Sequence, residues 1–123
     1  MATRLEPDKL ASARCEPVDA STPALPSDEV TRLSTGLDPA WDVQSERLVR
    51  SIAFTTFGAA FAFATRVALL AETQNHHPTL EISWGRLAVT WQTDAIGALT
   101  ANDLIMAAKV DRLVSRGLGI KDE

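Results

Sequence analysis

Apolar and polar residues alternate in two regions of the chain. In residues 47–54 one face carries Leu48, Arg50, Ile52 and Phe54, and residues 41–44 form a shorter segment before it. Residues 80–84 and 87–91 alternate in the same way, with a short Gly-Arg turn between them. Such alternation is typical of strands with one buried face. The pattern therefore predicts two β-hairpins, each with one apolar face.

Three other segments carry helix start and stop signals. We expect helices over residues 27–36, 55–75 and 100–117. Thr55 or Thr56 can cap the second helix. At the start of the third, Thr100 and Asp103 have the spacing of a capping box.

The apolar spacing within these helices predicts which side of each faces the core. The first helix would turn Val30 and Leu33 inward. The stripe predicted for the second consists of Phe57, Phe61, Ala64 and Ala68, and that for the third of Met106, Val110, Leu113 and Val114. One step further along the second stripe lies Glu72. If it is buried there, the pKa of its carboxyl is raised, whereas a frayed last turn would leave it solvated.

The order of elements is helix, two strands, helix, two strands, helix. This order predicts an α+β fold, a four-stranded antiparallel sheet with three helices on one face. Four prolines and scattered charges, without an apolar period, occupy residues 1–26. We interpret residues 1–26 as an extended, partly disordered leader and residues 27–123 as the domain.

Composition narrows the functional class. The chain has 123 residues, enough for one domain with a core, and 46% of them are apolar, which is too many for a disordered chain. Its net charge of −4 disfavours a nucleic-acid partner or an anionic membrane. We find no apolar run of membrane-spanning length and no signal peptide, so we expect a cytoplasmic protein.

The histidines mark a candidate chemical centre. The chain has two, His76 and His77, which are adjacent and directly followed by Pro78. Histidine is the side chain that titrates near neutral pH without perturbation, so one turn concentrates the groups suited to proton transfer. The plainer alternative is that these residues only end a helix and begin a strand.

Other kinds of chemistry are less well supported. Neighbouring side chains point in different directions, and a zinc site needs three or four ligands, so we expect no metal site. Cys15 is the single cysteine and cannot form an intrachain disulfide. No Ser, Thr or Cys lies in a recognisable nucleophile motif. Acid–base chemistry remains, with His76, His77, Glu72, Asp94 and Asp103 as the titrating groups.

A longer motif resembles a known family. It runs Glu72-x-x-x-His76-His77-Pro78, then Trp84, then Leu87-x-Val89-x-Trp91, then Gly97-x-Leu99-Thr100-x-x-Asp103. In this order, the motif is similar to the pterin-4a-carbinolamine dehydratase family. The resemblance implies a four-stranded antiparallel sheet with three helices on one face, and assembly into dimers or tetramers through sheet edges and helices.

The resemblance also implies an activity. Such enzymes remove water from a 4a-hydroxytetrahydropterin to give the quinonoid dihydropterin, so pterin is a substrate and no cofactor is expected. By resemblance, His76 and His77 are catalytic. The positions implied for substrate binding are Glu72, Pro78, Trp84 and Asp103. Asp103 also has a plain interpretation as an acidic residue in the first turn of a helix.

One position departs from the family pattern. The family has a third histidine where this chain has Asp94. Imidazole is poised near neutral pH, whereas a carboxylate is normally ionised at pH 7. Asp94 could act as a base but is poorly suited to donate a proton, and the loss of a positioned acid–base group typically costs about 10²–10⁴ in rate.

Two functions follow from this departure. The first hypothesis is a degenerate dehydratase-like protein that acts as a Rubisco assembly chaperone of the α-carboxysome, with the Rubisco large subunit as partner and an association with carboxysomes. The alternative is an active 4a-hydroxytetrahydrobiopterin dehydratase, a hydro-lyase in which Asp94 replaces the missing base. Both interpretations include a homodimer or tetramer. Binding a transcription factor is a third role, based on analogy alone.

Overall fold

The two predicted hairpins join through their longer strands into one sheet. The computed structural model describes residues 4–117 and 119–121. Its strands are β1 (Asp42–Val43), β2 (Leu48–Ala53), β3 (Thr79–Ser83) and β4 (Arg86–Trp91). They form a four-stranded antiparallel sheet in the order β1-β2-β4-β3, with Leu48 opposite Trp91. The predicted α+β class is therefore confirmed.

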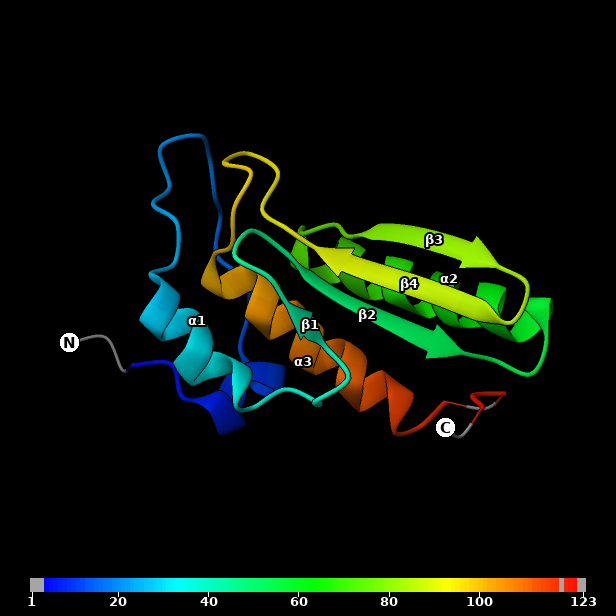
Figure 1. Cartoon of the computed structure of the whole chain (residues 1–123). Coiled ribbons are helices and arrows are strands. Elements are labelled where there is room, and N and C mark those ends of the chain that lie inside the picture. Colours follow the sequence, from blue (N-terminus) through cyan, green and yellow to red (C-terminus); the bar gives the residue numbers. More distant parts are fainter. Residues whose placement is uncertain (1–3, 118, 122–123) are drawn as a thin grey trace.

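Three α-helices accompany the sheet, as predicted. They are α1 (Ser27–Ser34), α2 (Phe57–Gln74) and α3 (Ala101–Val114). Helices α2 and α3 pack against the sheet, while α1 lies against α3 and the N-terminal segment (Figure 1). Among the described residues, no helix covers the other face of the sheet (Figure 1).

Alternation along the strands matches the burial. The inward side chains of β2 and β4 that lie in the core are Leu48, Ile52, Leu87, Val89 and Trp91. Arg50 also faces inward, and its charge is matched on α3, where Asp111 Oδ1 lies 2.6 Å from the guanidinium. A charge can occupy a core position when it is paired in this way.

The core stripe predicted for α2 is wrong except at Ala64. Phe57, Phe61 and Ala68 are exposed, and the buried residues are Ala60, Phe63, Ala64, Val67 and Ala71. Helix α2 is apolar on nearly every side, so the spacing of its apolar residues is compatible with more than one buried face. The face that is buried in the structure consists mostly of alanines, which allow a close approach of helix and strands.

Helix α3 is the most deeply buried element. Thr100 N–H donates to Asp103 Oδ2 over 3.0 Å, as the capping box requires. Met106 and Val110 are fully buried, while Leu113 and Val114 are half-buried, so this stripe is largely confirmed.

The N-terminal segment differs from the extended, partly disordered leader that was expected. Pro7–Ser12 forms a 3₁₀ helix, η1, which packs against α3 and α1 and whose Leu10 is fully buried. Lys109 Nζ on α3 donates to the carbonyl of Ala11 over 2.9 Å. Burial of Leu10 provides the stabilisation that a proline-rich segment would otherwise lack.

Candidate active site

The candidate site begins where α2 ends. Asn75 caps α2 in the left-handed conformation, with φ 51°, and turns the chain sharply into the two histidines. Asparagine tolerates this conformation better than most residues. His76 then points into the core, with 7% of its side chain exposed, whereas His77 points outward, with 52% exposed. The two adjacent imidazoles therefore have different surroundings.

His76 is held by a buried carboxylate. Its Nε2 lies 2.7 Å from Asp103 Oδ1, at the start of α3. Asp103 Oδ2 accepts a second hydrogen bond from Thr93 Oγ1, over 2.7 Å, in addition to that from the Thr100 backbone. The hydroxyls of Thr93 and Thr100 are 2.8 Å apart. These contacts give both oxygens of the carboxylate a hydrogen-bond partner, as a fully buried acid requires.

An aromatic ring fixes the orientation of His76. The imidazole stacks on Trp91, with ring centroids 5.9 Å apart and 12° between the planes. Trp91 is fully buried at the end of β4, so it is a rigid support. The sequence pointed to His76, Asp103 and the Thr100–Asp103 capping box, but it did not reveal Thr93 as a partner of Asp103, because nothing local in the sequence marks a contact between the segment after β4 and α3.

His77 and Asp94 face solvent on the open side of the sheet. Both line a cavity of about 270 Å³ with Arg47, Thr79, Glu81, Thr90 and Gln92. Both also line a smaller cavity of about 160 Å³, beside His76. Its remaining walls are Val18, Asn75, Gln92, Thr93 and Ala95. The chain therefore brings two imidazoles and a carboxylate to one polar hollow.

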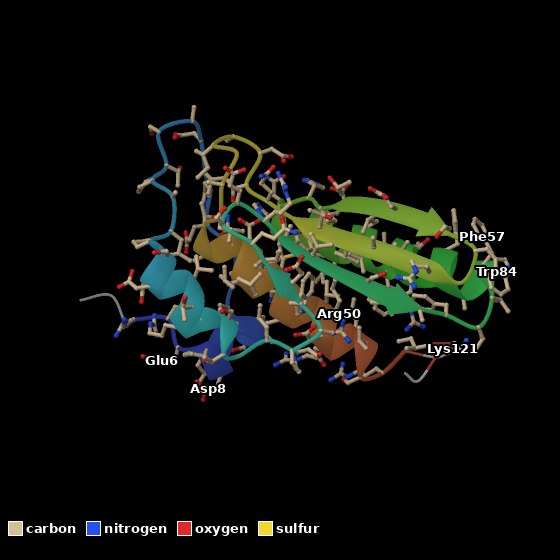
Figure 2. All side chains as sticks on the ribbon, viewed as in Figure 1. Glu6, Asp8, Arg50, Phe57, Trp84 and Lys121 are labelled. Carbon is tan, nitrogen blue, oxygen red and sulfur yellow. The ribbon has the colours of Figure 1, made fainter. Side chains whose placement is uncertain are left out.

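Other predicted site residues lie differently. Glu72 is exposed rather than buried, and its Oε2 lies 3.5 Å from His77 Nε2. Pro78 is half-buried between His77 and β3. Trp84 is 78% exposed at the β3–β4 turn, at the other end of β3 from His77 (Figure 2). The structure does not bring Trp84 to the histidines, so its assignment to a pterin site stays a prediction.

Within residues 4–117 and 119–121, no group of three or more His, Cys, Asp or Glu side chains could hold a metal ion. None of the helices there is long and apolar enough to cross a membrane.

Comparison with known proteins identifies the family of this chain. The family model described as pterin 4 alpha carbinolamine dehydratase matches residues 23–113, about three quarters of the chain. A Rubrobacter xylanophilus protein named "Putative pterin-4-alpha-carbinolamine dehydratase" is 44% identical over 106 residues, which cover 85% of this chain and 98% of that protein. A second relative with the same name, from Chlorobium limicola, is 42% identical over 110 residues, 86% of this chain and 96% of that protein.

A solved structure also matches. The crystal structure of a transcriptional coactivator/pterin dehydratase from Brucella melitensis is 31% identical, with a TM-score of 0.68 over 74% of this chain and 98% of that one. The family model covers all three α-helices up to Leu113, all four strands and the two histidines. The chain belongs to the pterin 4 alpha carbinolamine dehydratase family.

Proposed function

We propose that this chain binds a 4a-hydroxytetrahydropterin in the hollow beside His77 and catalyses its dehydration. The observation that carries the proposal is that His77 and Asp94 line the same two cavities, directly in front of the buried His76–Asp103 pair. Family membership supports this assignment, as does a relative of 44% identity that is named a dehydratase.

The two accessible groups suit the two proton transfers of the reaction. Dehydration breaks the C4a–O bond, and the hydroxyl leaves as water once it receives a proton. The ring nitrogen N5 loses its proton as the C4a–N5 double bond of the quinonoid dihydropterin forms. A protonated His77 would supply the first proton, and the carboxylate of Asp94 would accept the second. His76, held by Asp103, would position the ring rather than exchange protons with solvent.

The experiment measures how much the purified protein accelerates 4a-carbinolamine dehydration over the spontaneous rate. His77→Ala and Asp94→Asn should each lower this acceleration by about 10²-fold or more, because each removes one proton-transfer group. Asp42→Asn, which removes an equivalent surface charge on β1, is the matched control and should leave the rate unchanged. A wild type no faster than the spontaneous reaction would refute the proposal.

A second candidate follows from Asp94 itself. A carboxylate where the family has its third histidine favours a dehydratase-like scaffold that acts in Rubisco assembly in the α-carboxysome. On that interpretation the wild type does not accelerate 4a-carbinolamine dehydration, and Asp94→His restores this activity. Coexpression with Rubisco large subunits, with assembled enzyme measured on native gels, would then test the chaperone role. An unchanged yield of assembled Rubisco would exclude it.

We also propose that the chain associates with itself through α2. The outward side of this helix exposes Phe57, Phe61 and Leu69, which are 47%, 55% and 63% exposed. Exposed apolar clusters of this kind mark interaction sites. Sedimentation velocity should show an oligomer that Phe61→Glu dissociates and Thr31→Glu, on exposed α1, does not. A monomeric wild type would overturn this proposal.

A further inference from the structure

The N-terminal segment from Cys15 to Leu25 is bonded to the elements that carry the candidate site. We call residues 15–25 the strap. At its start, the backbone N–H of Cys15 donates to Gln74 Oε1 over 3.0 Å, and Gln74 lies two residues before His76. At its end, the N–H of Leu25 donates to the carbonyl of Leu99 over 2.8 Å. In Figure 1 the strap stands beside the loop that joins β4 to α3.

A paired contact ties the strap to α3 as well. Glu16 N–H donates to Asn102 Oδ1 over 2.9 Å, and Asn102 Nδ2 donates back to the Glu16 carbonyl over 2.8 Å. Asn102 is 4% exposed and directly precedes Asp103. The strap is thus held by Gln74, two residues before His76, and by Asn102, directly before Asp103.

Val18 places the strap at the edge of the site. It lines the cavity of about 160 Å³ together with His76, His77 and Asp94. It also lines a second cavity, of about 650 Å³, beneath the strap. The walls of this second cavity are mostly apolar and include Pro17, Pro23, Leu25, Ala101 and Ile105. Val18 therefore borders both the polar hollow and the larger apolar space.

The small cavity has the size of a flat heterocycle. Pockets for drug-sized ligands occupy about 300–1,000 Å³, so a cavity of about 160 Å³ suits one flat ring system. A substituent on that ring system extends beyond this cavity, and Val18 is the wall residue that the cavity shares with the larger apolar one. The neighbouring space past Val18 is wide and has apolar walls with few charges, so it suits a short neutral substituent better than a long anionic one.

We propose that Val18 is a specificity-determining residue, which decides the substituent that a bound pterin can carry. On this proposal the ring occupies the hollow at His77 and Asp94, and its side chain crosses the boundary at Val18, which we call the passage, into the cavity beneath the strap. This inference rests on the proposed function, because it assumes that the hollow takes a pterin.

The test is a fluorescence titration with two unreactive probes, unsubstituted pterin and biopterin, which carries a dihydroxypropyl group. Val18→Phe should narrow the passage and weaken biopterin binding about tenfold or more, because overpacking a confined site is costly. Binding of unsubstituted pterin should change less than about threefold. Ala20→Phe introduces the same aromatic side chain at an exposed strap residue that lines neither cavity, and it should leave both affinities unchanged.

A second variant covers the case in which Val18→Phe does not fold. Val18→Ala widens the passage, so folic acid, with its bulky substituent, should bind more tightly relative to unsubstituted pterin than it does to the wild type. If neither variant changes the ratio of the two affinities, or if Ala20→Phe changes it equally, Val18 has no such role and the pterin site stands. If the wild type binds neither probe, the proposed function fails, and this inference fails with it.

Discussion

His76 Nε2 and Asp103 Oδ1 lie 2.7 Å apart, although 27 residues separate them in the chain. The contact joins the end of α2 to the start of α3, and both side chains are buried. It thus fixes the direction in which the chain leaves α2, and with it the outward position of His77. The buried pair explains how one turn can present a single accessible imidazole to the hollow.

Asp103→Asn should destabilise the fold. Oδ2 of the carboxylate accepts from Thr93 and from the Thr100 backbone N–H, and Oδ1 lies 2.7 Å from His76 Nε2, so the amide nitrogen of asparagine would take the place of one of these two oxygens. A buried group left unsatisfied costs about 1–3 kcal/mol, so we expect the free energy of unfolding to fall by about that amount in urea titrations. Asp94→Asn, on an exposed residue, should change it by less than about 0.5 kcal/mol. Equal stability of the two variants would contradict the structural role of Asp103.

For the Arg50–Asp111 pair, we expect the loss of one partner to lower the free energy of unfolding more than the loss of both. Asp111 Oδ1 accepts from Arg50 over 2.6 Å and from Trp41 Nε1 over 2.7 Å, and the side chains of Arg50 and Asp111 are 11% and 19% exposed. Without Asp111, the buried Arg50 guanidinium is left with the longer contact of 3.8 Å to the exposed Asp38, so Asp111→Leu should cost about 3–5 kcal/mol. Arg50→Met in the same chain should recover part of that loss. A double variant no more stable than Asp111→Leu would show that the charge itself is not the cause.

Strand alternation predicted the sheet well, for a physical reason. The sheet has one covered and one open face, so the buried side chains of β2 and β4 had to fall at every second position. Helix α2 lacks such a contrast, because apolar residues also cover its exposed side. That is why Phe57 and Phe61 were wrongly placed in the core.

The site was only partly predictable. Adjacent histidines and a downstream aspartate are visible in the sequence. Their pairing across α2 and α3 depends on contacts that no local pattern encodes. The same holds for the strap: its prolines indicate an extended chain, but the bonds from Cys15 and Glu16 to Gln74 and Asn102 appear only in three dimensions.

Cys15 should react slowly with alkylating agents. Burial, the main cause, raises the pKa of its thiol to about 11, with a smaller contribution from the charge of Asp103. The thiolate is the reactive form, so alkylation by iodoacetamide at pH 8 should be about tenfold to a hundredfold slower in the native protein than in concentrated urea. The native rate should still rise with pH above 9, the ordinary pKa of the group. Cys15→Ser is the unlabelled control, and equal native and unfolded rates would contradict the burial of the thiol.

Glu29 should make stability depend on acid pH. Its carboxylate accepts from Arg32 Nε over 2.7 Å and from Arg4 over 2.8 Å, and these bonds lower its pKa from 4.5 to about 2. The folded state therefore binds this proton less tightly than the unfolded state. The contribution of Glu29 is complete above pH 4.5 and is lost as the pH falls toward 2. Urea midpoints measured across this range should fall more steeply for the wild type than for Glu29→Gln.

Glu81→Gln removes a carboxylate that has no ion pair among the described residues, and it should keep the steeper wild-type profile. Parallel profiles for the wild type and Glu29→Gln would contradict this role of the arginine contacts.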